Sequence, residues 1–563
     1  MREMKSVKSA LGRMRFAPRT WLRSLLGKTR SSGEELDDAR TFATWLAPAA
    51  RMNAPGSQAP LFVVLSFLPL AYCLKIERII AAAMQRAGYR VAFLTNDACR
   101  KIVMEYHRGH EPAPVLVLED HLKFLQSWQK RSQLRRLFAG DDVSLGKIKA
   151  FRYLGCYVGL HALATLSAST KDGRVQLDGA VRRRLKKIML HSMILVDTAQ
   201  STIGQLKPSI VMGVEKGFVG TAEIFYAALE NSVDYVQWTG CHEPNAIMLK
   251  RYRWNNYREH PFSISAGSWE RILSLPWDER YRDGVMAQFE AGYKQGAWFK
   301  YKSLAADQQQ RERQDLMAQL GLDPMKKTAV IYSHILNDAN LFYGDDLFPG
   351  GYEEWLVETV RAAASNPEVN WVLKLHPANV YRNARLGYSG KYGELLALEH
   401  AFGQVSDFLR VVYPEEKTSP LSFFKITDYG ITVRGTVGLE LPCFGIPTLT
   451  AGTGRYADKG FTVDSRTQEE YLEKIRSIHR IPALTAAQIQ LGQRYAYFVF
   501  RARPARYGDM FSDVYNFPVN HFRHRDVALD GQSANAILDH PQMQKIVSFL
   551  RSGEEDFLDL TAT

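Results

Sequence analysis

A histidine follows a short apolar run in the C-terminal half of the chain, and its position suits phosphate binding. Residues 371–375 predict a buried strand. The strand should stop at His376-Pro377, because proline has no N–H and fixes its own φ. Open α/β folds bind ligands at the carboxyl ends of their strands, so His376 and Pro377 are candidate phosphate-binding residues. The alternative is a turn that only ends the strand.

A glycine-rich turn further along the chain could contact the same phosphate. Residues 429–433 predict a strand, and the turn after it leads into a helix whose first N–H groups and positive dipole end would attract an anion. An arginine at the start of this turn could add a bidentate contact or form an ion pair at the sheet edge. The candidate residues of the turn are Arg434, Gly435, Thr436 and Gly438. Tyr456, after the next strand, could stack on a base or sugar, or pack in the core.

Two residues with acid–base chemistry follow predicted strands in the N-terminal half. Residues 210–214 form one strand, which ends at Glu215, and residues 233–238 form another, which ends before His242. A carboxylate or imidazole at such a position could act as a general base. The alternatives are a solvated loop carboxylate and a packed, hydrogen-bonded histidine.

These side chains need parallel sheets to position them. Strand 61–67, helix 74–87 and strand 90–95 open a βαβ unit, which favours an α/β fold with a parallel sheet. The expected division is a basic segment and linker (1–60), an N-terminal Rossmann-like domain that faces the acceptor (61–300), a helical connector (301–326), a C-terminal Rossmann-like domain (327–484) and a helical extension (485–563).

Composition narrows the class of protein. The chain has 563 residues, 46% of them hydrophobic, with a net charge of +13 that predicts an anionic partner. No nucleic-acid-binding signature is present, so nucleic acid is not expected as that partner. The five cysteines are dispersed without a CxxC, which predicts neither disulfides nor structural zinc. No segment resembles a secretory signal or a membrane span, so we expect a cytoplasmic protein. The pair Asp345-Asp346 is interpreted as solvated, and no metal site is expected.

Two basic stretches could meet anionic surfaces. Residues 1–30 carry two short apolar stripes among lysines and arginines, which is typical of a segment that lies on an anionic membrane. The alternative is a solvated basic tail. Residues 181–187 read VRRRLKK, interpreted as a solvated helix face, with an acceptor-facing or lipid-facing patch as the alternative.

Four motifs together resemble a known family. They are GVEKGFVGTAEIFYAALENSVDYVQW, YSHILNDANLF, KLHPANVYR and VRGTVGLELPCFGIPTLTAGTGRYADKGFT. In this order they resemble the bacterial capsule and surface polysaccharide biosynthesis proteins, relatives of the Kdo-transferase-like glycosyltransferases. The resemblance spans residues 200–480. It implies a GT-B architecture, in which two Rossmann-like domains face a cleft and the C-terminal one binds a nucleotide sugar, with no metal or other cofactor.

The resemblance also implies roles for particular residues. His376, Pro377 and Thr436 would contact the donor phosphate, and Glu440 would hold the ribose. Related enzymes carry an acid-acid-Gly motif as general base, whereas this chain has Glu215-Lys216-Gly217, with a lysine in place of the second acid. The related enzymes use cytidine nucleotides, so the donor is expected to be CMP-linked.

We therefore predict a metal-independent GT-B glycosyltransferase, associated with the inner face of the cytoplasmic membrane. It would transfer a sugar from a nucleotide-activated donor to an oligosaccharide or lipid-linked glycan of a growing capsular or surface polysaccharide. The alternatives are a CDP-polyol phosphotransferase of the teichoic-acid polymerase type, a sugar-nucleotide epimerase, and a non-catalytic scaffold of an envelope assembly complex.

Overall fold

The computed structural model describes residues 31–50, 56–109, 113–122, 127–140, 143–170, 172–294, 309–336, 340–404, 407–515 and 525–562. Residues 1–30, for which membrane contact is predicted, lie outside the described residues.

Seven strands form the N-terminal sheet, in the order β12-β6-β5-β4-β1-β2-β3. Its parallel strands are β1 (Leu61–Leu65), β2 (Arg90–Thr95), β3 (Val115–Val117), β4 (Ile210–Gly213) and β5 (Asp234–Gly240). The last two strands at one side of the sheet are antiparallel to their inner neighbours, β6 (Ala246–Tyr252) to β5 and the edge strand β12 (Pro504–Arg506) to β6. All five residues of β1 are buried, because helices cover both faces of the sheet.

The covering helices divide between the two faces. Phe62 and Val64 of β1 pack in one core cluster with α4, whereas Val63 and Leu65 pack in another with α9. The helices of this half are α3 (Gly33–Ala50), α4 (Ala71–Arg86), α5 (Arg100–Tyr106), α6 (Ser127–Leu137), α7 (Leu145–Lys149), α8 (Val158–Ser167), α9 (Gly179–Leu206), α10 (Ala222–Glu230), α11 (Ala266–Ser274) and α12 (Glu279–Lys294).

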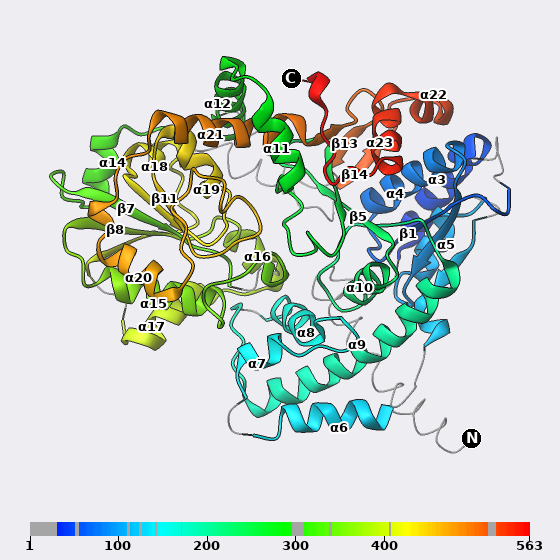
Figure 1. Ribbon diagram of the computed structural model, residues 1–563, viewed down its shortest axis with the longest axis horizontal. Coiled ribbons are helices and arrows are strands. Elements are labelled where there is room, and N and C mark those ends of the chain that lie inside the picture. The colour runs from blue at the N-terminus through cyan, green and yellow to red at the C-terminus, as the bar shows by residue number, and fades with distance from the viewer. Residues whose placement is uncertain are drawn as a thin grey trace.

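The C-terminal sheet has five parallel strands in the order β11-β10-β7-β8-β9. They are β7 (Lys327–Tyr332), β8 (Val369–Lys374), β9 (Leu409–Val412), β10 (Tyr429–Thr432) and β11 (Thr448–Thr450). The helices are α14 (Arg313–Gln319), α15 (Tyr352–Ala363), α16 (Asn379–Leu386), α17 (Gly393–Phe402), α18 (Pro420–Ile426), α19 (Val437–Glu440) and α20 (Gln468–Arg476). Both sheets place their parallel strands in the same Rossmann order, and the expected GT-B-like pair of domains is confirmed (Figure 1).

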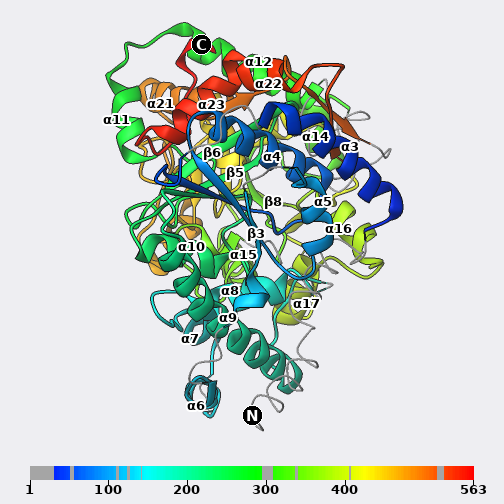
Figure 2. The ribbon, with the colours of Figure 1, turned by 90° about the vertical axis from the view of Figure 1, so that its right-hand side faces the viewer.

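The C-terminal segment differs from the helical extension that the sequence predicts. After α21 (Ala486–Tyr497) and the π-helix η5 (Phe498–Ala502), the chain returns to the N-terminal domain and adds β12 to its sheet. The hairpin of β13 (Ser512–Tyr515) and β14 (Arg525–Ala528) follows, and then α22 (Ala534–Asp539) and α23 (Pro541–Arg551). Figure 2 shows α22 and α23 beside α4. Their apolar residues complete the core on that face of the sheet.

The expected linker before residue 61 contains a helix. α3 places Leu36, Ala39, Phe42 and Leu46 in the core against α4 and α5, at helical spacing. Within the described ranges, no helix combines the length and the apolarity that crossing a bilayer requires.

Candidate functional site

The carboxyl edge of the C-terminal sheet collects the predicted phosphate-binding residues. The strand order reverses between β7 and β10, and α/β folds bind ligands in the crevice at such a reversal. His334 follows β7, His376 follows β8 and the Gly435-Thr436 turn follows β10. The predicted positions of His376 and of the turn at strand ends therefore agree with the structure.

His376 is half-buried, and hydrogen bonds hold both its backbone and its ring. Its own N–H donates to Ser333 Oγ at 3.0 Å, and its Nδ1 accepts the N–H of Ala378 at 3.1 Å. A backbone N–H can only donate, so the proton of the neutral ring sits on Nε2. Burial, with Lys374 nearby, lowers the pKa of His376 to about 4. His376 therefore offers a neutral Nε2–H donor at physiological pH.

His334 is a second histidine at this edge, and its proton is fixed in the opposite way. Its Nε2 accepts the N–H of Val433 at 3.2 Å and lies 3.1 Å from Thr432 Oγ1, so the proton sits on Nδ1. The ring stacks on Tyr352 with centroids 4.4 Å apart. Burial lowers the pKa of His334 well below its usual value, and His376 adds to this effect. The sequence-based prediction missed His334, although its signal was the same as for His376: a histidine directly after a buried strand.

The glycine-rich turn is held from behind by Tyr456. The Tyr456 hydroxyl donates to the Gly435 carbonyl at 2.6 Å, and only 1% of the residue is exposed. A Cβ on Gly438 would lie 2.0 Å from that hydroxyl oxygen, so the close approach requires glycine. Tyr456 thus packs in the core and shapes the turn, and its geometry does not support stacking on a base or sugar.

The turn presents N–H groups from a very short helix. Gly438 N–H donates to the Gly435 carbonyl, and Leu439 and Glu440 N–H donate to the Thr436 carbonyl. The N–H groups of Thr436 and Val437 have no acceptor among the described residues. α19 spans one turn before it becomes the 3₁₀ helix η3 (Leu441–Phe444), so these two N–H groups, rather than a long helix dipole, would attract an anion.

Two arginines flank the turn, and the one that the sequence did not predict lies beside Thr436. Arg434 is 3% exposed, and its guanidinium is engaged in the interior by an ion pair with Asp346 and by the Tyr352 hydroxyl. Arg455, after β11, donates to the Arg434 carbonyl at 3.1 Å and to Thr436 Oγ1 at 3.5 Å. Burial lowers the pKa of Arg455, and its Nε has no partner. Arg455 is therefore the cation beside Thr436, and the sequence-based prediction did not include it.

Glu440 lies in the interior, against α12. It is fully buried, and one carboxylate oxygen accepts the Tyr293 hydroxyl at 2.8 Å. Burial raises the pKa of Glu440 to about 7. Its other oxygen is buried without a partner. The ribose contact remains a prediction, because no oxygen of Glu440 reaches the surface of the turn.

Glu215 and Lys216 occupy the carboxyl edge of the N-terminal sheet, directly after β4. Glu215 is half-buried, and its backbone carbonyl accepts the Tyr235 hydroxyl at 2.7 Å. The Lys216 ammonium lies inside an aromatic cage, which we define by the rings whose centroids are 4.4–5.9 Å from Nζ: Phe225, Tyr252, Phe342 and Tyr343. Lys216 also donates to the Tyr257 carbonyl at 2.5 Å. Burial lowers its pKa far below the usual value, although Glu215 opposes the shift.

His242 is placed differently from the predicted catalytic base. Its Nε2 donates to the Phe500 carbonyl at 3.0 Å, and its Nδ1 lies 3.2 Å from Cys241 Sγ. The ring is 5% exposed, and burial lowers its pKa to about 3. Because both ring nitrogens are engaged inside the protein, His242 joins β5 to η5 and cannot accept a substrate proton in this position.

A loop of the C-terminal domain joins the two sheet edges. Phe342 and Tyr343, in and after η2 (Asn340–Phe342), supply half of the aromatic cage. The next two acids bind arginines from both sides: Asp345 pairs with Arg258 and Asp346 with Arg434. The solvated interpretation holds for Asp345, whose side chain is 72% exposed, and was wrong for Asp346, whose side chain is 14% exposed and paired with a buried arginine. Among the described residues, no group of three or more potential metal-ligating side chains is found.

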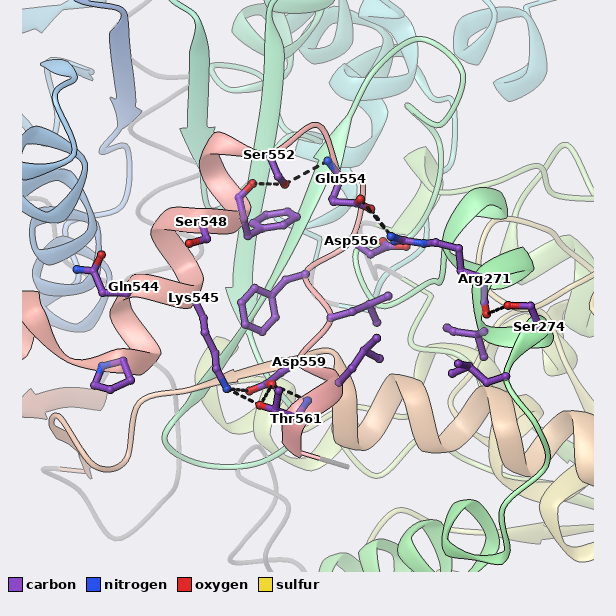
Figure 3. Close-up of a pocket in the computed structure, with 17 residues that line it drawn as sticks. Arg271, Ser274, Gln544, Lys545, Ser548, Ser552, Glu554, Asp556, Asp559 and Thr561 are labelled. Atoms are coloured by element: carbon purple, nitrogen blue, oxygen red, sulfur yellow. Dashed lines mark hydrogen bonds and ion pairs between the residues drawn. The ribbon is translucent and has the colours of Figure 1, made fainter.

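A surface groove of about 950 Å³ lies elsewhere, between α11, α23 and the C-terminal tail (Figure 3). An ion pair of Arg271 with Glu554 at 2.6 Å lies at one side. Lys545 binds Asp559 at 2.7 Å and Thr561 at 2.8 Å at the other. None of the predicted site residues lines this groove.

Comparisons with known proteins find likeness only among solved structures. No protein-family model and no curated protein matches the chain. The chain is similar to the KpsC β-Kdo 2,4 transferase of Thermosulfurimonas dismutans, with 14% identity and a TM-score of 0.34 over 59% of this chain and 87% of that one. The KpsC β-Kdo 2,7 transferase of that organism is 14% identical, with a TM-score of 0.32 over 62% of this chain and 89% of that one. The UDP-GlcNAc 2-epimerase of Neisseria meningitidis is 12% identical, with a TM-score of 0.23 over 78% of this chain and 97% of that one. These likenesses are weak in identity and in superposition, and the strand order stands as the evidence for the fold.

Proposed function

We propose that the chain is a glycosyltransferase that binds the phosphate of a nucleotide-activated sugar at the carboxyl edge of its C-terminal sheet. One observation carries the proposal: His334 and His376 each have one ring nitrogen occupied by a backbone N–H, which leaves the other as a fixed donor. The N–H groups of Thr436 and Val437 and the guanidinium of Arg455 complete the phosphate-binding set.

The chemistry follows from where charge develops. Breaking the bond between the sugar carbon and the phosphate oxygen leaves negative charge on the phosphate, and donors already in position stabilise it without reorganisation. Glu215 is the proposed general base. It takes the proton of an acceptor hydroxyl whose oxygen forms the new bond to the sugar. The departing nucleotide carries the electron pair of the broken bond.

The donor and acceptor are proposed from the resemblance of the motifs. A CMP-linked sugar is the proposed donor, and an oligosaccharide or lipid-linked glycan of a capsular or surface polysaccharide is the proposed acceptor, at the cytoplasmic face of the membrane. A CDP-polyol phosphotransferase would use the same phosphate-binding set. Analysis of the product distinguishes the two, because only the phosphotransferase leaves phosphate in the new linkage.

A nucleotide-binding panel tests the proposal. Thermal unfolding is followed with CMP, CDP, UDP and GDP for the wild type, His376→Ala, and His121→Ala as an exposed-histidine control. A ligand at about 100 times its Kd adds about 2.7 kcal/mol to the free energy of unfolding. We expect stabilisation by a cytidine nucleotide that His376→Ala loses and His121→Ala keeps. A response to no nucleotide would favour the scaffold instead.

A further inference from the structure

Two helices at the outer edge of the N-terminal domain carry basic side chains without acidic ones. α6 and the first half of α9 contact each other and lie at the edge of the molecule in both views (Figures 1 and 2). α6 has four lysines and arginines and no acid. α9 has five between residues 182 and 187, and its first acid is Asp197. This concentration of one sign of charge needs an explanation beyond solubility.

Some of these cations serve packing. Lys130 is buried and pairs with Asp197 at 2.6 Å, which joins α6 to α9. Lys186 lies 5.1 Å above the ring of Phe138. Other cations point outward, and within the described part of the chain they form no ion pair. They are Arg131, Arg135, Arg136, Arg183 and Lys187. Neighbouring cations of one sign create a positive potential that an anionic partner surface would complement.

An exposed tryptophan stands among these cations. Trp128 is 71% exposed, the most exposed tryptophan among the described residues. Its spacing to Arg131 and Arg135 places all three on one face of α6. Tryptophan and arginine side chains side by side are typical of proteins that meet the headgroup region of a bilayer.

We propose that the basic helix surface, defined as Trp128, Arg131, Arg135, Arg136, Arg183 and Lys187, binds a bilayer that contains anionic phospholipids. Trp128 enters the headgroup region, and the arginines and lysine contact phosphate groups. A single ring on the convex side of a helix suits a flat surface better than a nucleic acid, which would stack on several rings in a groove. The surface is separate from residues 1–30, and its link to a lipid-linked acceptor rests on the proposed function.

The position of this surface suits a lipid-linked acceptor. α7 and α8 follow α6 in the chain and reach the other domain: Lys149 of α7 donates to the Pro349 carbonyl at 2.6 Å, and α8 contacts η2. A bilayer bound at α6 would thus lie on the side of the N-terminal domain where α7 and α8 contact the other domain.

Vesicle binding by the full-length chain tests the proposal. Co-sedimentation is measured with phosphatidylcholine vesicles with and without phosphatidylglycerol. The triple variant Arg131→Gln, Arg135→Gln and Arg136→Gln is compared with a control of equal charge change, Arg361→Gln, Arg410→Gln and Arg551→Gln, whose arginines are exposed on other helices and strands. Each cation near an anionic surface contributes about fivefold to binding, so we expect about a 100-fold loss for the first variant and little loss for the control.

Quenching by brominated phosphatidylglycerol locates the contact. The wild-type fluorescence should be quenched on vesicle binding, and Trp128→Phe should lose that part of the quenching. Equal losses of binding in the two triple variants, or unchanged quenching in Trp128→Phe, would overturn the proposal. Binding to RNA or to an acidic polysaccharide in place of the vesicles would also overturn it. Circular dichroism melting curves show whether each variant stays folded.

Discussion

The two sheet edges share one strand order but differ in how their polar groups are held. At the C-terminal edge, backbone N–H groups from the same domain fix His334 and His376. At the N-terminal edge, the cage around Lys216 takes two of its four rings from the other domain. The C-terminal edge is therefore complete within its own domain, whereas the N-terminal edge is complete only when the domains touch. Binding of a donor and readiness of the proposed base can then be separated by mutation.

Replacing the proposed base should have the largest effect. Glu215→Gln removes the proton acceptor, and loss of a general base lowers kcat by about 10²–10⁴-fold. His376→Ala removes a phosphate donor and should lower kcat by about 10²–10³-fold. The two variants separate in nucleotide binding: calorimetry should give an unchanged Kd for Glu215→Gln and a weaker one for His376→Ala. An equal loss of binding in both would mean that the edges do not act separately.

Two glycines allow each edge to be disturbed alone. A Cβ on Gly438 would lie 2.0 Å from the Tyr456 hydroxyl oxygen, and one on Gly217 would lie 1.8 Å from Phe342 Cζ. Overpacking of this kind lowers the free energy of unfolding by about 1–3 kcal/mol. Gly438→Ala should also lose nucleotide binding. Gly217→Ala should keep it and should make the loop that carries Phe342 more sensitive to protease, as limited proteolysis would detect. Nucleotide binding retained in Gly438→Ala would contradict the proposed role of the turn.

Glu394 should have a smaller effect, because it acts through other residues. Its carboxylate accepts Ser333 Oγ at 3.2 Å and Asn379 Nδ2 at 2.7 Å, and Ser333 in turn accepts the N–H of His376. Glu394→Ala leaves buried donors unpaired and should weaken nucleotide binding about tenfold, or about 1.4 kcal/mol. Glu394→Gln keeps an acceptor oxygen and should recover most of the affinity. A Gln variant as weak as the Ala variant would show that the charge, rather than the positioning, matters.

The smallest expected change is one with pH. An anion favours the charged imidazole, so its affinity rises as the pH falls toward the pKa of the free histidine. The pKa of His376 is about 4, well below the usual value. The Kd of a methyl ester of CMP, whose single charge does not titrate here, should therefore be equal at about pH 8 and pH 6.5. Titration calorimetry would contradict a neutral donor if affinity rose between those values and His376→Ala removed the rise.

Local patterns predict the strands well. Buried strands were expected at residues 61–67, 90–95 and 429–433, and the structure has β1, β2 and β10 there with ends within two residues. The sequence predicts that the proline after His376 and the glycines after β10 lie at strand ends on one sheet edge, and the structure places them there. These features depend on neighbours in sequence, which a single chain shows directly.

Features that depend on distant partners could not be predicted. β12 pairs with β6 although the whole C-terminal domain lies between them in the sequence, and no local pattern indicates that contact. The choice of Arg455 over Arg434 depends on Asp346, whose side chain comes from another loop. His242 looked like a strand-end base because nothing near it in the sequence shows that the Phe500 carbonyl accepts a hydrogen bond from its Nε2.

The return of the chain to the N-terminal sheet sets an order of folding during synthesis. β6 brings Lys250 into the interior, where Asp556 accepts it at 2.8 Å and also accepts Arg503 at 2.8 Å. Arg251 donates to the carbonyls of Phe549 and Leu550. Until residues 549–556 have been made, Lys250 has only Glu259 and Ser265 as partners, and Arg251 has only Asp234 as its acidic partner. A buried cation that lacks part of its charge compensation is destabilising. The N-terminal domain is translated first, yet the buried contacts of its β6 are complete only after residues 549–556 have been made.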